Sequence, residues 1–272
     1  MGKASRWEAA GIAEQGARHI ADGTPCQDAV RVYQDPDMVI VAVADGHGDP
    51  RHARSDEGAE FAVEVAAHLL RELGQTLLED EVLPQPLALE NRLQQHLPAR
   101  ICWEWNRRVR TALGHLEDSG AWHSDVQEFG TTILGALFTE TLMVCVQLGD
   151  GDILVVDGQG DAANVFPPHS EIYGGITHSL CQPGAAAWAR VCCRHWHPST
   201  RLAMLSSDGV RDSLGDDEAA FLSVGDWLLR RITEQGWETA LDGLGPWLQE
   251  LSRLGNGDDV TIGVVHWRSV PS

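Results

Sequence analysis

The sequence is short of lysine and of long apolar runs, and each shortage excludes a class of protein. Lys3 is the only lysine among 272 residues, so the Gly-Lys-Ser/Thr step of a P-loop nucleotide site is absent. No apolar run approaches the roughly 20 residues that span a bilayer, and the first residues lack the apolar core of a secretion signal. We therefore expect a cytoplasmic protein that binds no membrane.

Basic residues are scarce as well. The chain has 20 Lys and Arg against 40 Asp and Glu, a formal net charge of −20, which argues against binding to nucleic-acid phosphates. No Cys-x-x-Cys pair occurs among the six cysteines. Cys192-Cys193-Arg194-His195-Trp196-His197 could bind zinc, but adjacent cysteines chelate one tetrahedral ion poorly, and a strand flanking a loop is favoured.

Residue periodicity predicts blocks of strands and helices. Runs of period two predict strands, and apolar residues recurring every three to four positions predict amphipathic helices. The expected strands cover residues 8–12, 29–33, 38–44, 142–148 and 260–265, with a hairpin turn at 139–141 and mostly loop at 158–200. The expected helices cover 52–73, a region after Pro86 that Pro98 kinks or splits, 218–231, and 237–251 with a bend at Gly245-Pro246. Blocks rather than strict alternation indicate one α+β domain over residues 1–272.

Carboxylates stand at the edges of four strand-like runs. The runs adjoin Asp45-Gly46-His47-Gly48, Gly149-Asp150-Gly151, Ser207-Asp208-Gly209 and Gly257-Asp258-Asp259. Each alone is an ordinary turn, but four carboxylates brought together repel one another unless a cation neutralises them. Oxygen ligands alone indicate Mg²⁺ or Mn²⁺.

Six short motifs follow one another along the chain. They are Gln27-Asp28, Asp45-Gly46-His47-Gly48, Gly130-Thr131-Thr132, Gly149-Asp150-Gly151, Ser207-Asp208-Gly209-Val210-Arg211-Asp212 and Gly257-Asp258-Asp259-Val260-Thr261. In this order they resemble the motifs of the PP2C (PPM) metal-dependent serine/threonine phosphatases, from about Trp7 to Trp267, and Pro25-Cys26-Gln27-Asp28 is similar to a compact bacterial branch. The resemblance implies an α-β-β-α sandwich, two packed antiparallel sheets flanked by helices, that dephosphorylates serine and threonine in proteins.

The resemblance also implies a binuclear Mn²⁺ or Mg²⁺ centre with a bridging water as nucleophile. Asp45 would bridge the two ions, and the Gly46 carbonyl would bind one of them. Asp208 and Asp258 would hold the other. Asp28 would support the site through a metal-bound water.

Further residues receive roles from the same resemblance. Asp150 and Asp212 would bind a third, weaker ion. His47 would be the general acid that protonates the leaving alkoxide as an imidazolium. Asp259 replaces a frequent asparagine, so the choice between Asp258 and Asp259 as ligand stays open, with Asp258 favoured.

The chain departs from the family pattern in its means of binding the substrate phosphate. Gln27 stands where the family usually has an acid. Gly23 occupies the position nearest to a phosphate-binding arginine of many members, which leaves Arg18 or His19 as substitutes.

Two other readings stay open. Gln27 and the missing arginine are compatible with a catalytically weak or inactive scaffold of the same fold. Asp150-Gly151-Asp152 loosely resembles the nucleophile loop of HAD-type small-molecule phosphatases, but that family generally needs a lysine beside the phosphate. A Cys102–Arg108 cysteine phosphatase fails because the pair lies in a helical pattern with bulky tryptophans.

The expected partners follow from the resemblance. The substrate would be a phosphorylated protein, and the enzyme would oppose a serine/threonine kinase. We expect no nucleic-acid partner, and we assume a monomer.

Overall fold

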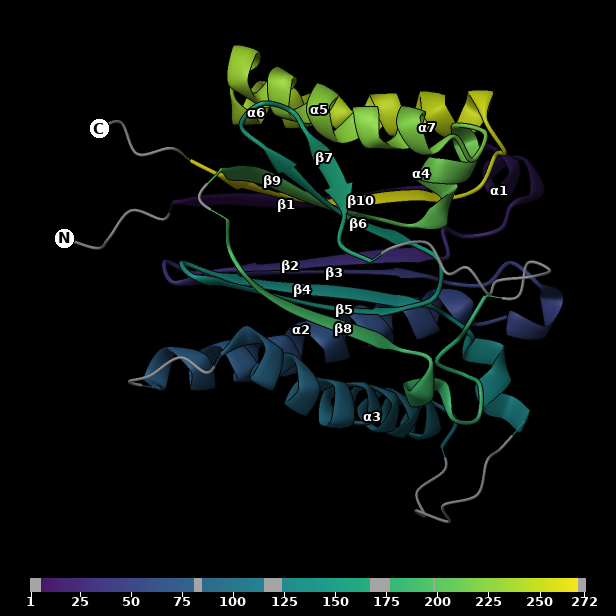
Figure 1. The fold of residues 1–272 in the computed structure, drawn as a ribbon. Coiled ribbons are helices and arrows are strands. Elements are labelled where there is room, and N and C mark those ends of the chain that lie inside the picture. Colours follow the sequence, from purple (N-terminus) through teal and green to yellow (C-terminus); the bar gives the residue numbers. More distant parts are fainter. Residues whose placement is uncertain (1–5, 81–84, 115–123, 167–176, 198, 269–272) are drawn as a thin grey trace.

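Two five-stranded antiparallel sheets lie face to face between two layers of helices (Figure 1). The computed structural model describes residues 6–80, 85–114, 124–166, 177–197 and 199–268. The predicted α+β sandwich of two packed sheets with helices outside is confirmed. In the described ranges no helix is long and apolar enough to cross a membrane.

The first sheet has the strand order β1-β10-β9-β6-β7, and the second has β2-β3-β4-β5-β8. The strands of the first are β1 (Trp7–Glu14), β10 (Val260–Trp267), β9 (Thr200–Ser206), β6 (Asp152–Asp157) and β7 (Ala162–Asn164). Those of the second are β2 (Asp28–Gln34), β3 (Met38–Asp45), β4 (Ile133–Thr139), β5 (Leu142–Leu148) and β8 (Arg190–His195). The expected hairpin turn at 139–141 joins β4 to β5, and Cys192 and Cys193 lie in β8 as ordinary strand residues.

Helices cover the outer face of each sheet. In Figure 1, α2 (Ser55–Glu79) and α3 (Pro86–Ala112) lie below the second sheet. The helices α5 (Glu218–Gln235), α6 (Trp237–Asp242) and α7 (Leu244–Leu254) cover the first. Two short helices, α1 (Ala17–Asp22) and α4 (Asp208–Ser213), lie at one end of the sandwich.

Strand β3 shows why its apolar run is continuous. Alternate residues point to opposite faces of a strand. Val39, Val41 and Val43 pack between the sheets, whereas Ile40 and Ala42 pack against the helical layer of α2 and α3. Because both faces are buried, the strand needs apolar residues at every position until Asp45, where it reaches the end of the sandwich.

The sheets approach each other closely at Gly263 of β10. A Cβ atom there would lie 2.2 Å from Cγ1 of Val41 on the facing sheet. Only glycine fits at this separation, so Gly263 allows the two sheets to pack closely here.

Two predicted helix interruptions were placed differently from the structure. Helix α3 is not split at Pro98 but runs on through it, and Leu97 and Ile101, on either side of the proline, are buried in the core. The expected 237–251 helix divides at Gly243 rather than bending at Gly245-Pro246. Pro246 lies in the first turn of α7, where a missing N–H leaves no helical bond unmade.

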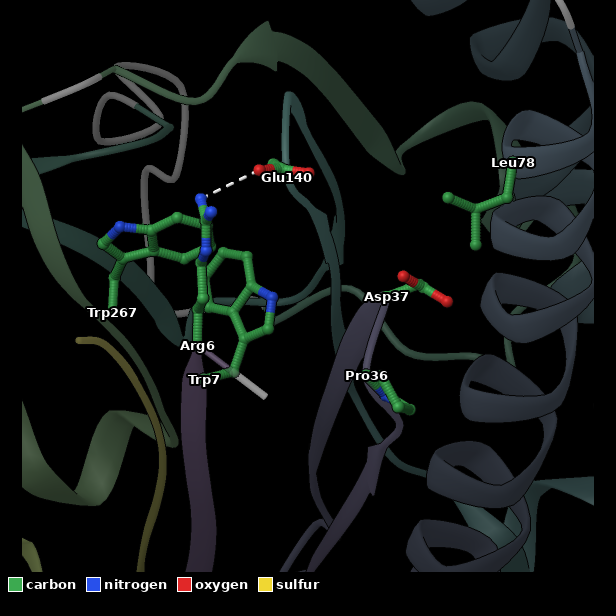
Figure 2. Close-up of a pocket in the computed structure, with 7 residues that line it drawn as sticks. All are labelled: Arg6, Trp7, Pro36, Asp37, Leu78, Glu140 and Trp267. Atoms are coloured by element: carbon green, nitrogen blue, oxygen red, sulfur yellow. Dashed lines mark hydrogen bonds and ion pairs between the residues drawn. The ribbon is translucent and has the colours of Figure 1, made fainter. Parts of the chain in front are cut away.

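Aromatic side chains close the end of the sandwich where β1 begins and β10 ends. A small cavity of about 60 Å³ lies there, and Figure 2 shows Trp7 and Trp267 beside each other on its wall. Their ring centroids are 4.0 Å apart. Arg6 pairs with Glu140 across the same cavity, at 2.8 Å.

Candidate metal centre

The predicted aspartates gather at the opposite end of the sandwich. Asp28 at the start of β2 is the direct cross-strand partner of Asp45 at the end of β3. Asp208 follows β9 and opens α4, so the first sheet places its carboxylate beside those of the second. Five carboxyl groups of this cluster have a raised pKa, namely Asp28, Asp45, Asp150, Asp208 and Asp212. The sixth member, Asp258, contributes charge that raises the pKa of Asp208 and Asp212.

Crowding keeps three of these carboxyl groups protonated well above their usual range. Burial, with the charges of Asp259 and Asp208, raises the pKa of Asp28 to about 8. Burial, with the charges of Asp208 and Asp28, raises the pKa of Asp45 well above its usual value. Burial and nearby carboxylates, Asp150 first, raise the pKa of Asp208 to about 7. Concentrated negative charge of this kind is what a divalent cation relieves.

The clustered carboxylates are suitable ligands for a hard cation, although their side chains are not arranged as a preformed metal site. Within the described ranges, no three His, Cys, Asp or Glu side chains stand close enough to hold a metal ion. The charge of Asp208 nevertheless acts directly on Asp45, and the buried Oδ2 of Asp28 has no hydrogen-bond partner. Carboxylate oxygens suit Mg²⁺ or Mn²⁺, so the chemistry of the donors fits such an ion.

The Gly130-Thr131-Thr132 motif holds the backbone of Asp45. The Asp45 N–H donates to Oγ1 of Thr132 at 3.0 Å, and the Asp45 carbonyl accepts from the hydroxyl of Thr131 and the N–H of Thr132, each at 2.8 Å. A Cβ on Gly46 would lie 2.6 Å from the Gln27 carbonyl oxygen, so glycine is required there. The loop that bears Asp45 and the Gly46 carbonyl is therefore rigidly placed.

Gln27 braces the same loop from the β2 side. Its amide nitrogen donates to Oγ of Ser55, the first residue of α2, at 2.6 Å, and to the His47 carbonyl at 3.4 Å. Gln27 thus links the start of β2, the loop that bears Asp45 and Gly46, and the start of α2. These bonds give the glutamine a structural role at a position where the family usually has an acid.

A buried ion pair fixes the helix that carries Asp208. Arg211 of α4 donates to both oxygens of Asp152 in β6, at 2.8 and 2.5 Å, and Asn164 donates to the same carboxylate at 2.5 Å. Bidentate pairs of this kind constrain orientation strongly. This pair was not predicted, because nothing in the local sequence of either residue links Asp152 to Arg211.

Asp258 and Asp259 have different surroundings. Asp259 is buried, and its two oxygens accept the N–H groups of Gly16 and Gln27, each at 2.6 Å. Asp258 is half-buried and faces the carboxylate cluster, where its charge raises the pKa of Asp208. Because both oxygens of Asp259 already accept backbone N–H groups, Asp258 is the better candidate for a metal ligand.

The two candidate phosphate contacts, Arg18 and His19, are both engaged. The His19 ring is buried, and its Nδ1 lies 2.9 Å from Oδ1 of Asp259. Arg18 is exposed, and its guanidinium lies 3.1 Å from Oδ2 of Asp258. His19 is thus part of the support beneath the site, whereas Arg18 can reach a ligand only by leaving or sharing Asp258.

His47 lies beside the carboxylate cluster in a half-buried position, with its ring centroid 4.9 Å from that of His52. Burial, and then the proximity of His52, lower the pKa of His47 to about 4. The ring is therefore neutral at neutral pH, which differs from the expected imidazolium.

Comparison with known proteins agrees with this geometry. The family model for protein phosphatase 2C matches residues 15–249, and the chain belongs to that family. The predicted resemblance is therefore confirmed.

Individual relatives are distant in sequence. Serine/threonine-protein phosphatase 3 of Escherichia coli K12 is 27% identical over 189 residues, which are 66% of this chain and 65% of that protein. The match thus spans just under two thirds of that relative. The catalytic domain of the phosphatase PstP, solved with two manganese ions, has a TM-score of 0.58 at 17% identity, covering 97% of this chain and 99% of that one. Stp1 of Staphylococcus aureus has a TM-score of 0.59 at 17% identity, covering 96% and 95%. These structures share the fold.

The raised pKa values predict a pH-dependent stability of the metal-free protein. Between pH 4 and 8 the native state holds protons on Asp28 and Asp208 that the unfolded chain has lost, so stability falls as the pH rises. We expect the melting temperature to drop by at least about 4 °C from pH 5 to pH 8, and Mn²⁺ to raise it more at pH 8 than at pH 5. The control is Asp28→Asn, which should flatten the pH dependence; an unchanged slope would contradict the assignment.

The contrast between the two neighbouring aspartates is also testable. Asp259→Asn leaves buried N–H donors without a full carboxylate, so we expect a loss of about 3 kcal/mol of unfolding free energy in urea titrations. Asp258→Asn should cost under about 1 kcal/mol yet weaken Mn²⁺ binding measured by calorimetry. If Asp259→Asn impaired Mn²⁺ binding without loss of stability, the two roles would be reversed.

Proposed function

We propose that this chain is a metal-dependent phosphatase that removes phosphate from phosphoserine and phosphothreonine in proteins. The observation that carries the proposal is the cluster of Asp28, Asp45 and Asp208, which keep their protons when no cation is present and whose charges a divalent cation would neutralise. Membership of the protein phosphatase 2C family and the manganese ions in the PstP structure support it.

The residues that would hold the ions follow from their positions. The carboxylates of Asp45, Asp208 and Asp258 and the Gly46 carbonyl would hold the Mn²⁺ or Mg²⁺ ions. Asp28 would orient water at the site through its unpaired oxygen. When bound, the ions would polarise the phosphoryl group and lower the pKa of an attacking water.

Two outer carboxylates extend the cluster. The hydroxyl of Thr177 donates to the half-buried Asp150. Partial burial, then the charges of Asp216 and Asp150, raise the pKa of Asp212. Asp150 and Asp212 would hold a third, weaker ion, and the exposure of Asp212 to water makes this ion the easiest to lose.

His47 would assist departure of the seryl or threonyl oxygen. A neutral ring must first gain a proton, and the negative charge of a nearby phosphate favours that by raising the imidazole pKa. Donation to the alkoxide would then contribute about 10²–10⁴ in rate.

Two alternative functions were considered from the sequence. Membership of the 2C family decides against a HAD-type mechanism with Asp150 as nucleophile. The inactive scaffold stays a possible outcome, because Gln27 and Gly23 still lack the charges that other members use. The assay below separates it from an enzyme.

We expect the purified chain to hydrolyse p-nitrophenyl phosphate and a phosphothreonine peptide with Mn²⁺ and to stop with chelator. Asp45→Asn and Asp208→Ala should each lower kcat/KM by at least about 100-fold, because each removes an ion-holding carboxylate. Asp242→Asn, on exposed helix α6, is the matched control and should retain full activity. A parent that folds and binds Mn²⁺ but turns over neither substrate would establish the scaffold instead.

Replacing His47 by glutamine tests its role through the leaving group. Threonine needs a proton to depart, whereas p-nitrophenolate does not. We expect His47→Gln to lower kcat by about 100-fold or more on the phosphothreonine peptide, with a much smaller loss on p-nitrophenyl phosphate. Equal losses on both substrates in steady-state kinetics would show that His47 is not the proton donor.

A further inference from the structure

A second recess adjoins the carboxylate cluster on the side of His47. It is a cavity of about 380 Å³, lined by His47 and His52 on one wall, Thr177 and Ser179 on another, and Asp49 and Arg51. None of its described lining residues belongs to the six clustered aspartates. Thr177 hydrogen-bonds to Asp150, however, so the cavity meets the cluster at His47 and at Thr177.

The position of His47 indicates what the cavity receives. A general acid lies next to the atom that departs. In a phosphoprotein that atom is the side-chain oxygen of serine or threonine, and the polypeptide continues beyond it. A recess lined by His47 is therefore on the leaving-group side, where the substrate chain would lie.

The charged pair in this recess is held in a defined geometry. Asp49 accepts from Nε of Arg51 at 3.0 Å, from its Nη2 at 3.1 Å and from its backbone N–H at 2.9 Å. The Arg51 side chain is nevertheless 69% exposed. Asp49 occupies one edge of the guanidinium, and the remaining N–H groups are able to bind another carboxylate.

Arg51 is a local positive charge on a strongly acidic protein. The formal net charge of −20 repels acidic peptides at a distance. Arg51 is the only arginine or lysine among the described residues that line the cavity. It is thus the local group that could accept an acidic substrate residue.

We propose that the cavity beside His47 binds the polypeptide flanking the phosphorylated residue and that Arg51 pairs there with an acidic side chain of the substrate. Asp49 orients Arg51 and balances its charge. The pair therefore determines how strongly the enzyme prefers acidic over basic residues beside the phosphorylated residue. This assignment rests on the proposed phosphatase function and adds a substrate preference to it.

The test compares two phosphothreonine peptides that differ only in having glutamates or lysines on both sides of the phosphothreonine. The measured quantity is the ratio of their kcat/KM values with Mn²⁺. Arg51→Gln, which makes the pair negative, should lower the Glu-to-Lys ratio about fivefold. Asp49→Asn, which makes it positive and keeps a side chain able to cap the Arg51 N–H, should raise the ratio about threefold.

Matched controls isolate the cavity. Glu250→Gln and Arg253→Gln alter an exposed pair on α7, in the opposite helical layer, with Nη2–Oε1 at 2.5 Å, and should leave the ratio unchanged. Equal ratios in the parent, Arg51→Gln and Asp49→Asn would overturn the proposal. So would an Arg51→Gln variant that weakens both peptides and p-nitrophenyl phosphate alike, because Arg51 would then act on the phosphate or on the fold.

Failure of the phosphatase function is recognised separately, as absence of turnover on p-nitrophenyl phosphate by the parent. In that case the same two peptides, labelled with a fluorophore, give the ratio of dissociation constants by anisotropy. A ratio that follows Arg51 and Asp49 supports the recess as a peptide site without catalysis. If neither substitution changes the ratio of dissociation constants, the proposal of a peptide site is overturned.

Discussion

The close packing of the two sheets confines several carboxylates at one end of the molecule, and the rest of the site depends on that confinement. Gly263 allows β10 to approach Val41 without a side chain between them, and with the sheets packed this closely the charge of Asp208, after one sheet, raises the pKa of Asp45 on the other. Asp28 adds a third carboxyl group from the neighbouring strand. The apolar contacts between the sheets thus supply the free energy that holds like charges together.

The remaining contacts around the cluster stabilise this unfavourable arrangement. Thr131 and Thr132 hold the Asp45 backbone, and the Arg211–Asp152 pair fixes α4. These groups are neutral or paired, so they add rigidity without adding unpaired negative charge. A site supported in this way loses little entropy when a cation enters, because most of its backbone is already in place.

Much of this could be predicted from the sequence, and the exceptions share a cause. The alternation of Val39, Val41 and Val43 and the abrupt Asp45 are local patterns, so both the buried strand and its terminal carboxylate were predictable. The choice of Asp258 over Asp259 was not settled, because it depends on the N–H groups of Gly16 and Gln27, distant in sequence. Pro98 was expected to interrupt a helix whose tertiary packing maintains it. Arg51 has no sequence signal, since its position matters only through the cavity that it shares with His47.

The aromatic cluster at the far end of the sandwich has a practical consequence. Trp7 and Trp267 belong to one sheet, Phe138 belongs to the other, and Trp196 follows directly on its last strand. Trp196 lies 5.4 Å from Trp7 and 5.3 Å from Phe138, centroid to centroid. These rings bridge the two sheets at the end far from the aspartates, so any change in the spacing of the sheets must alter their packing. Substitutions in this cluster therefore reach the aspartates only through the strands that join the two ends.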